Sequence, residues 1–267
     1  MSTEVVRLAI KTFGDVTATL GEQDVAVAEI NRPPDNYFDA ALIGSLADAL
    51  HWLQRDGARA IVLSSAGKNF CAGADFTGRS GQTRLSDGGA GELYEQAFRL
   101  FQVPVPVVAA VQGAAVGGGL GLACAADFRV ASPQSRFSAN FAKIGLHQGF
   151  ALSVTLPAIV GQQHAAELLY TGKRIGGEEA ARIGLADRLV GTDNLRGAAH
   201  ELAAEIASAA PLAVRAIRAT MRDGVADRAR AAMARELSEQ QQLWPTADFA
   251  EGVKAAAERR PPRFAGR

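Results

Sequence analysis

Over residues 1–191, apolar positions alternate between helical spacing and short continuous runs. From Leu42 to Leu53 they recur at the spacing of an amphipathic helix, and Asp39 stands where an N-cap belongs. The short apolar runs are typical of strands buried inside a sheet. Alternating strands and helices predict an α/β fold. The predicted elements are a hairpin of residues 16–20 and 25–31, a helix over 39–54, strands at 60–64 and 107–111, and a helix over about 91–101.

The C-terminal part of the chain shows helical segments with no strand signal between them. Pro211, Gly224 and Pro245 separate these segments, because proline and glycine interrupt helices. Each segment carries an apolar stripe that needs a partner surface. The chain therefore divides into a core of residues 1–191 and a helical module of residues 192–267; a helical cap on the chain's own core is the alternative. The predicted helices cover residues 195–209, 212–221, 226–243 and 247–259.

The most informative stretch follows the strand at 107–111, where the chain reaches the glycine triplet Gly117-Gly118-Gly119. An apolar helix start comes directly after the triplet. Glycine lets the backbone approach a ligand closely, and the first N–H groups of a helix lack partners within it. Such donors suit a developing negative charge. Tight packing of the helix on a sheet is the alternative explanation, and no G-x-G-x-x-G register fits.

A second small-residue turn follows the strand at 60–64. It covers residues 67–76 and reads Gly-Lys-Asn-Phe-Cys-Ala-Gly-Ala-Asp-Phe. Both turns come after a buried strand and are rich in small residues, so they offer backbone groups rather than long side chains. Together they can present two backbone N–H groups to one oxyanion, as acyl-transfer and enolate chemistry requires.

Further motifs accompany the two turns, and they lie at residues 30–33 (Ile-Asn-Arg-Pro), 70–75, 106–123, 126–131, 137–149, 156–161 (Leu-Pro-Ala-Ile-Val-Gly), 169–175, 184–187, 251–252 and 259–261. With these motifs the chain resembles the crotonase superfamily, the enoyl-CoA hydratase/isomerase family, over residues 16–264. They stand in the family's order and at its spacing. The resemblance implies a spiral of β-β-α units with a C-terminal helical trimerisation module, assembled as a homotrimer or as a hexamer of two trimers.

The resemblance also implies where the active site lies. The oxyanion-hole donors of the family correspond to the backbone N–H groups of Ala74 and Gly118, which polarise the thioester carbonyl of an acyl-CoA and stabilise its enolate. The expected partner is an acyl-CoA thioester, with coenzyme A as part of the substrate, no separate cofactor and no metal. The residues expected to bind substrate are Ala72, Asp75, Phe76, Ala115, Gly117, Gly121, Asn140 and Phe141.

The acid positions depart from the family pattern. The two positions where a typical hydratase carries glutamates are Gly121 and Phe141, and the aspartate position of other members is Gly149. Hydration needs one carboxylate to deprotonate water and another to deliver a proton to the α-carbon. Histidine is the residue type best suited to acid–base chemistry near neutral pH, and His147 is the candidate general base. A loop histidine without a catalytic role is the alternative.

Other ionisable residues carry weaker signals. Glu92, Tyr94 and Glu95 begin a helix that could fold over the acyl pocket, and they are interpreted as solvated helix residues. Cys71 and Cys124 stand among apolar and small residues and predict two packed, reduced thiols rather than a disulfide.

Composition limits the classes of partner. The chain of 267 residues has 28 basic and 28 acidic side chains, which gives no general attraction to nucleic acid or to an anionic membrane. No apolar run reaches the length of a membrane span, and the N-terminal residues lack a signal-peptide core. We expect a cytoplasmic protein with no nucleic-acid or membrane partner.

These features predict an acyl-CoA-processing enzyme that acts through a thioester enolate. The classes closest to the resemblance are the lyases and isomerases of fatty acid metabolism, and the exact reaction stays open because the usual acids are absent. The alternative is an acyl-CoA-binding or scaffold protein that keeps the fold without catalytic activity.

Overall fold

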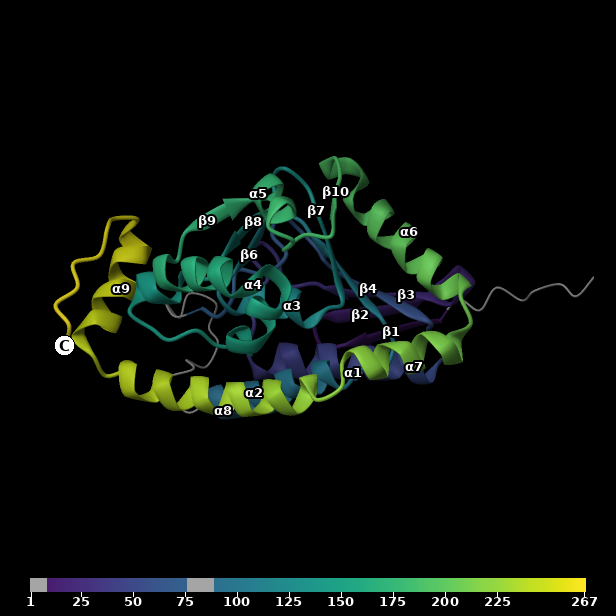
Figure 1. The fold of residues 1–267 in the computed structure, drawn as a ribbon, viewed down its shortest axis with the longest axis horizontal. Coiled ribbons are helices and arrows are strands. Elements are labelled where there is room, and N and C mark those ends of the chain that lie inside the picture. Colours follow the sequence, from purple (N-terminus) through teal and green to yellow (C-terminus); the bar gives the residue numbers. More distant parts are fainter. Residues whose placement is uncertain (1–8, 76–88) are drawn as a thin grey trace, which may run out of the picture.

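The strands form one large and one small sheet (Figure 1). The computed structural model describes residues 9–75 and 89–267. The large sheet contains β1 (Ala9–Phe13), β2 (Val16–Leu20), β3 (Val25–Ile30), β4 (Ala60–Ser65), β5 (Val107–Val111), β7 (Phe128–Ala131) and β10 (Arg188–Leu189). The small sheet contains β6 (Ala114–Val116), β8 (Arg136–Ser138) and β9 (Arg174–Gly176).

Helices surround the two sheets, and the first of them begins as predicted directly after Asp39. The Asp39 carboxylate accepts a hydrogen bond from the Leu42 N–H at 2.8 Å, as an N-cap does. The helices are α1 (Ala40–Arg55), α2 (Gly89–Phe101), α3 (Gly118–Ala125), α4 (Leu152–Thr171), α5 (Gly177–Arg182), α6 (Leu195–Ser208), α7 (Pro211–Met221), α8 (Val225–Leu243) and α9 (Ala247–Glu258), with 3-10 turns η1 (Glu22–Asp24), η3 (Asn140–Ile144) and η4 (Thr192–Asn194).

The chain winds through both sheets in repeating units. It places a strand in the large sheet, the next strand in the small sheet, and then a helix: β5, β6 and α3, followed by β7, β8 and α4. The large sheet is parallel from β3 to β10, in the order β3-β4-β5-β7-β10, and the hairpin of β2 and β3 continues it with antiparallel pairing. The α/β spiral expected from the sequence is confirmed.

The large sheet is covered on both faces, which explains its continuous apolar runs. In β5, Ala109 and Val111 face the main core with α1 to α4, whereas Val108 and Ala110 face a second cluster. Leu202 of α6 packs in that second cluster, and α6 runs along this face of the sheet (Figure 1). A strand buried on both sides needs apolar residues at every position rather than at alternate ones.

The C-terminal part is helical, as predicted, and most of its helices pack on the chain's own core. α6 contacts the large sheet, α8 contacts α2 and α4, and α9 contacts η3. α7 buries none of its side chains and exposes Leu212, Ile217 and Met221, while Arg218 binds Asp127 of the core at 3.0 Å. None of the helices in the described ranges is long and apolar enough to cross a membrane. The domain boundary after residue 191 stays a prediction.

The two cysteines are buried and do not form a disulfide. Burial raises the pKa of the Cys71 thiol to about 12 and that of the Cys124 thiol to about 11. Both side chains are therefore packed as neutral thiols, because the reactive thiolate is suppressed in such surroundings. Within residues 9–75 and 89–267, no group of three or more histidine, cysteine, aspartate or glutamate side chains is arranged to hold a metal ion.

Candidate active site

The two small-residue turns lie side by side because the segments before them are bridged. Cys71 pairs with Ala115 in parallel, and the Val116 N–H donates to the Cys71 carbonyl oxygen at 3.0 Å. A Cβ atom on Gly119 would lie 2.1 Å from that same carbonyl oxygen, so only glycine fits there. Tight packing therefore explains Gly119, and the same packing brings the two turns together.

The N–H groups of Ala74 and Gly118 stand at the facing ends of the turns. A Cβ atom on Gly73 would lie 3.5 Å from the Gly118 nitrogen, which shows how closely the segments approach. Gly118 is the first residue of α3 and follows Gly117, whose φ of 57° L-residues rarely adopt. Between described residues, neither N–H donates a hydrogen bond, and both residues line one cavity.

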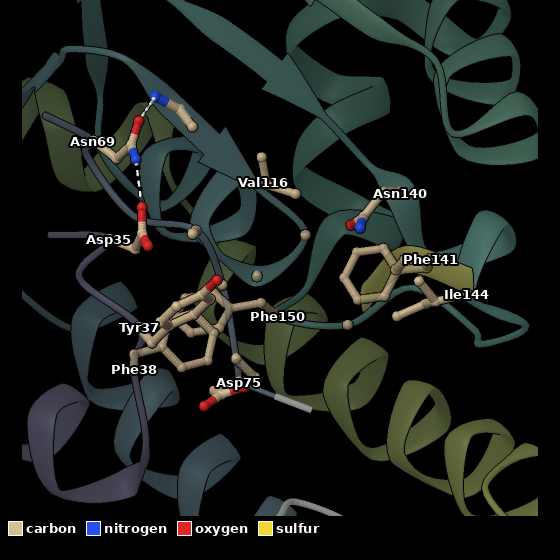
Figure 2. Close-up of a pocket in the computed structure, with 18 of the residues that line it drawn as sticks. Asp35, Tyr37, Phe38, Asn69, Asp75, Val116, Asn140, Phe141, Ile144 and Phe150 are labelled. Atoms are coloured by element: carbon tan, nitrogen blue, oxygen red, sulfur yellow. Dashed lines mark hydrogen bonds between the residues drawn. The ribbon is translucent and has the colours of Figure 1, made fainter. Parts of the chain in front are cut away.

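The cavity has a volume of about 570 Å³, within the size range of small-molecule sites. Its walls come from segments far apart in the sequence, including α2, α8, α9 and η3. Figure 2 shows aromatic rings on one side of the cavity and the η3 side chains across from them. The rings belong to Tyr37, Phe38 and Phe150, and the side chains across from them are Asn140, Phe141 and Ile144.

One part of the cavity wall is polar and basic. Lys68, Arg136 and Arg174 line it, together with Asp35 and Asn69. The Asn69 amide donates to the Asp35 carboxylate at 2.6 Å and accepts a backbone N–H at 3.0 Å, so its orientation is held at both ends (Figure 2). Three cationic side chains on the wall of one cavity suit a ligand that carries several negative charges.

Another part of the wall is apolar and aromatic. The Phe38 and Phe150 rings lie with their centroids 5.4 Å apart. Phe150 fills the space beside Gly121, because a Cβ atom there would lie 2.6 Å from the Phe150 Cβ atom. In the same way, a Cβ atom on Gly149 would lie 2.2 Å from the Tyr94 hydroxyl oxygen. Aromatic side chains thus occupy the space beside Gly121 and Gly149, two of the three positions at which the sequence resemblance led us to expect an acid.

A model of known enoyl-CoA hydratases and isomerases matches residues 21–267. The chain belongs to the enoyl-CoA hydratase/isomerase family. It is similar to a probable enoyl-CoA hydratase of Rhodobacter capsulatus, at 36% identity over 92% of this chain and 96% of the relative. It is also similar to a crotonyl-CoA hydratase of Syntrophomonas wolfei, at 34% identity over 91% and 95%. A solved enoyl-CoA hydratase/isomerase from Pseudoalteromonas atlantica superposes with a TM-score of 0.82 at 31% identity, covering 94% of this chain and 100% of that chain.

In this enoyl-CoA hydratase/isomerase family member, most predicted site residues line the cavity. Contrary to the prediction, Ala115 does not line the cavity, because this residue is buried in β6. Gly121 does not line it either, because Phe150 covers it. Phe76 lies outside the described residues. The predicted residues that do line the cavity are Ala72, Ala74, Asp75, Gly117, Gly118, Asn140 and Phe141.

His147 is absent from the cavity wall, contrary to the geometry expected of a general base. Its ring Nδ1 lies 2.8 Å from the carbonyl oxygen of Gln148, the next residue in the chain. The ring is therefore engaged within its own turn, and the alternative of a loop histidine describes its position better.

The interpretation of Tyr94 as a solvated helix residue is wrong. Its side chain is only 9% exposed and lines the cavity, whereas Glu92 and Glu95 of the same helix are exposed as expected. The Tyr94 hydroxyl donates to the Gln240 side-chain oxygen of α8 at 3.0 Å. Helical periodicity around Tyr94 gives no hint of this contact, because the partner lies 146 positions further along the chain.

Glu236 of α8 is a buried residue that the sequence analysis did not single out. Its fully buried carboxylate caps α4 by accepting from the Ala151 N–H at 2.8 Å and from the Ser153 N–H at 3.0 Å. Burial raises the pKa of Glu236, although these hydrogen bonds act in the opposite direction. Glu236 lies on the buried face of α8 together with Met233 and Gln240. Its helical spacing from these residues is the one sequence feature that indicates its burial.

Replacing Glu236 with glutamine is expected to lower the free energy of unfolding by about 1–3 kcal/mol, because one backbone N–H then faces an amide NH₂. Since the pKa of Glu236 is raised in the folded state, its contribution is largest below the unfolded pKa and falls as pH rises through the folded one. Urea unfolding should therefore show a larger loss at about pH 5 than at about pH 7. Glu95→Gln, at an exposed position of α2, is the matched control. An unchanged stability, or a loss that shrinks towards acid pH, contradicts this assignment.

Proposed function

We propose that this protein is an acyl-CoA-processing enzyme that stabilises a thioester enolate with the backbone N–H groups of Ala74 and Gly118. The observation that carries the proposal is a pair of N–H donors on adjacent turns, which meet no acceptor among the described residues and border one cavity. Two fixed donors aimed at one carbonyl oxygen are what enolate chemistry needs. The named relatives, hydratases of acyl-CoA thioesters, support the same class of substrate.

Lys68, Arg136 and Arg174 are proposed to hold the phosphate groups of coenzyme A. These side chains supply charge where a polyanionic carrier would enter, and the apolar wall beyond them suits the acyl group. Coenzyme A is then part of the substrate, and the proposal needs no further cofactor. Phe141 and Phe150 add large apolar surfaces that dry the acyl part, which favours a bulky or aromatic acyl group.

A binding or scaffold protein is the second candidate function, and a separate observation supports it. Phe150 and Tyr94 occupy the space beside Gly121 and Gly149, and His147 does not reach the cavity. The carboxylates that do line the cavity among the described residues are Asp35 and Asp75. Asp75 follows the Ala74 N–H directly and is thus the first residue to vary in a search for a proton-transfer group.

Deuterium incorporation from D₂O tests the proposal whichever reaction the enolate goes on to undergo. A panel of short, long, branched and aromatic acyl-CoA thioesters is incubated with the protein and analysed by mass spectrometry, while calorimetry gives each dissociation constant. An enzyme that forms the enolate exchanges hydrogen at the α-carbon of at least one thioester. Binding without exchange or product favours the scaffold candidate, and no binding at all overturns both.

The exposed apolar side chains of α7 support a homotrimer or a hexamer as the proposed assembly. Leu212 is 81% exposed, Ile217 is 59% exposed and Met221 is 80% exposed in the isolated chain. Such a face gains stability when a second copy covers it. Light scattering at micromolar concentration should give three or six times the chain mass, and a monomer contradicts the proposal. A cytoplasmic location remains a prediction.

A further inference from the structure

Tyr94 lines the cavity together with Phe38 and Phe150, and its hydroxyl lies at Gly149, the residue before Phe150. It is held by α8, because the hydroxyl donates to the Gln240 side-chain oxygen at 3.0 Å. The position of the Tyr94 hydroxyl is therefore fixed before any ligand enters.

The direction of the Tyr94 hydrogen bond follows from the other end of Gln240. The Gln240 Nε2 atom donates to the carbonyl oxygen of His147 at 3.0 Å and lies 3.4 Å from that of Gln148. Carbonyl oxygens only accept, so the amide must turn its NH₂ group towards them and its oxygen towards Tyr94. Tyr94 is thus the donor in that bond, and its hydroxyl proton is used in the hydrogen bond to Gln240.

What Tyr94 offers to a ligand is a lone pair of its hydroxyl oxygen. A hydroxyl group donates one hydrogen bond and can accept two, and the bond to Gln240 uses the donor. Burial, followed by the charge of Glu236, raises the pKa of Tyr94, so the phenol stays neutral and acts as neither base nor anion. Lys68, Arg136 and Arg174, the cations of the described lining, belong to the basic part of the wall.

We propose that Tyr94 determines substrate specificity by accepting a hydrogen bond from a hydroxyl group on an otherwise apolar acyl chain. The substrate class is then a hydroxylated acyl-CoA. An acyl chain that ends in a carboxylate is disfavoured, because an acceptor facing an anion in an aromatic wall repels it. This inference rests on the proposed acyl-CoA function and adds the chemistry of the acyl group to it.

Calorimetry with matched pairs of ligands tests the inference without depending on turnover. The probes are phenylacetyl-CoA with 4-hydroxyphenylacetyl-CoA, and octanoyl-CoA with 8-hydroxyoctanoyl-CoA. The wild-type protein should bind at least one hydroxylated member roughly 3- to 10-fold more tightly than its parent, the value of one buried hydrogen bond. Tyr94→Phe should bind both members of that pair equally, while Tyr37→Phe, a change to another cavity tyrosine, should keep the preference.

A second variant covers the case in which Tyr94→Phe does not fold. Gly149→Ala places a Cβ atom 2.2 Å from the Tyr94 hydroxyl oxygen and should displace it, which removes the preference while the phenol is retained. The inference is overturned if neither hydroxylated ligand binds more tightly than its parent, or if the preference survives in both variants. Failure of all four thioesters to bind would instead overturn the proposed acyl-CoA function, on which this inference rests.

Discussion

Crotonyl-CoA hydration by this protein is expected to be at least about 10⁴-fold slower than by a hydratase that carries both glutamates. A positioned acid or base is worth about 10²–10⁴ in rate, and neither of the two positions expected to carry one, Gly121 and Phe141, has an acidic side chain. Gly121 has no side chain, and Phe141 has an apolar ring that lines the cavity. The assay is the loss of the conjugated thioester absorbance, with such a hydratase measured alongside.

The structure adds a reason why a single substitution does not restore hydration. A Cβ atom on Gly121 would lie 2.6 Å from the Phe150 Cβ atom, so a glutamate there collides with the ring. Gly121→Glu combined with Phe141→Glu should stay inactive unless Phe150 is also replaced by glycine, which removes that Cβ atom and suits the backbone φ of 60° at this position. A wild-type turnover near the enzyme median of about 10 per second would contradict this view of the site.

Replacing Gly118 with proline should lower the rate of α-carbon deuterium exchange by about 10²–10³, the usual value of one oxyanion donor. Proline removes the N–H group yet suits this position, since Gly118 is the first residue of α3. The variant also adds a Cβ atom, which would lie 2.3 Å from the tip of the Phe38 ring.

Gly118→Ala is the matched control, because it adds the same Cβ atom and keeps the N–H donor. The difference between the two variants therefore isolates the N–H group from the contact with Phe38. Infrared difference spectra of the bound thioester carbonyl give a second measurement, in which proline should reverse the shift to lower frequency. Equal exchange rates in the two variants would remove Gly118 from the proposed oxyanion hole.

The fold could be predicted from the sequence because its signals are local. The doubly buried strands show as continuous apolar runs, and the Asp39 cap shows as one residue before a periodic segment. The two turns were also predictable, since each shows as a run of small residues that comes after a short apolar run. These elements depend on neighbours a few residues away.

The other half of the site depends on contacts between distant segments. Tyr94 is buried where its hydroxyl meets Gln240 of α8, and no sequence pattern within α2 indicates this hydrogen bond. Phe150 covers Gly121 with a backbone φ of 60°, a conformation that favours glycine and is not expected of phenylalanine. The expectation for His147 rested on its residue type and its position in the chain, and its contact with the neighbouring carbonyl oxygen shows why these were insufficient.

The last helix of the chain completes the wall of the cavity. Val253 and Ala256 of α9 line it, and a Cβ atom on Gly252 would lie 2.4 Å from the carbonyl carbon of Ile144 in η3, so the two backbones touch. During synthesis, the Ala74 and Gly118 turns leave the ribosome long before α9 does. A nascent chain thus carries both turns while one wall of the cavity is still missing, and that wall is complete only after α9 has been synthesised.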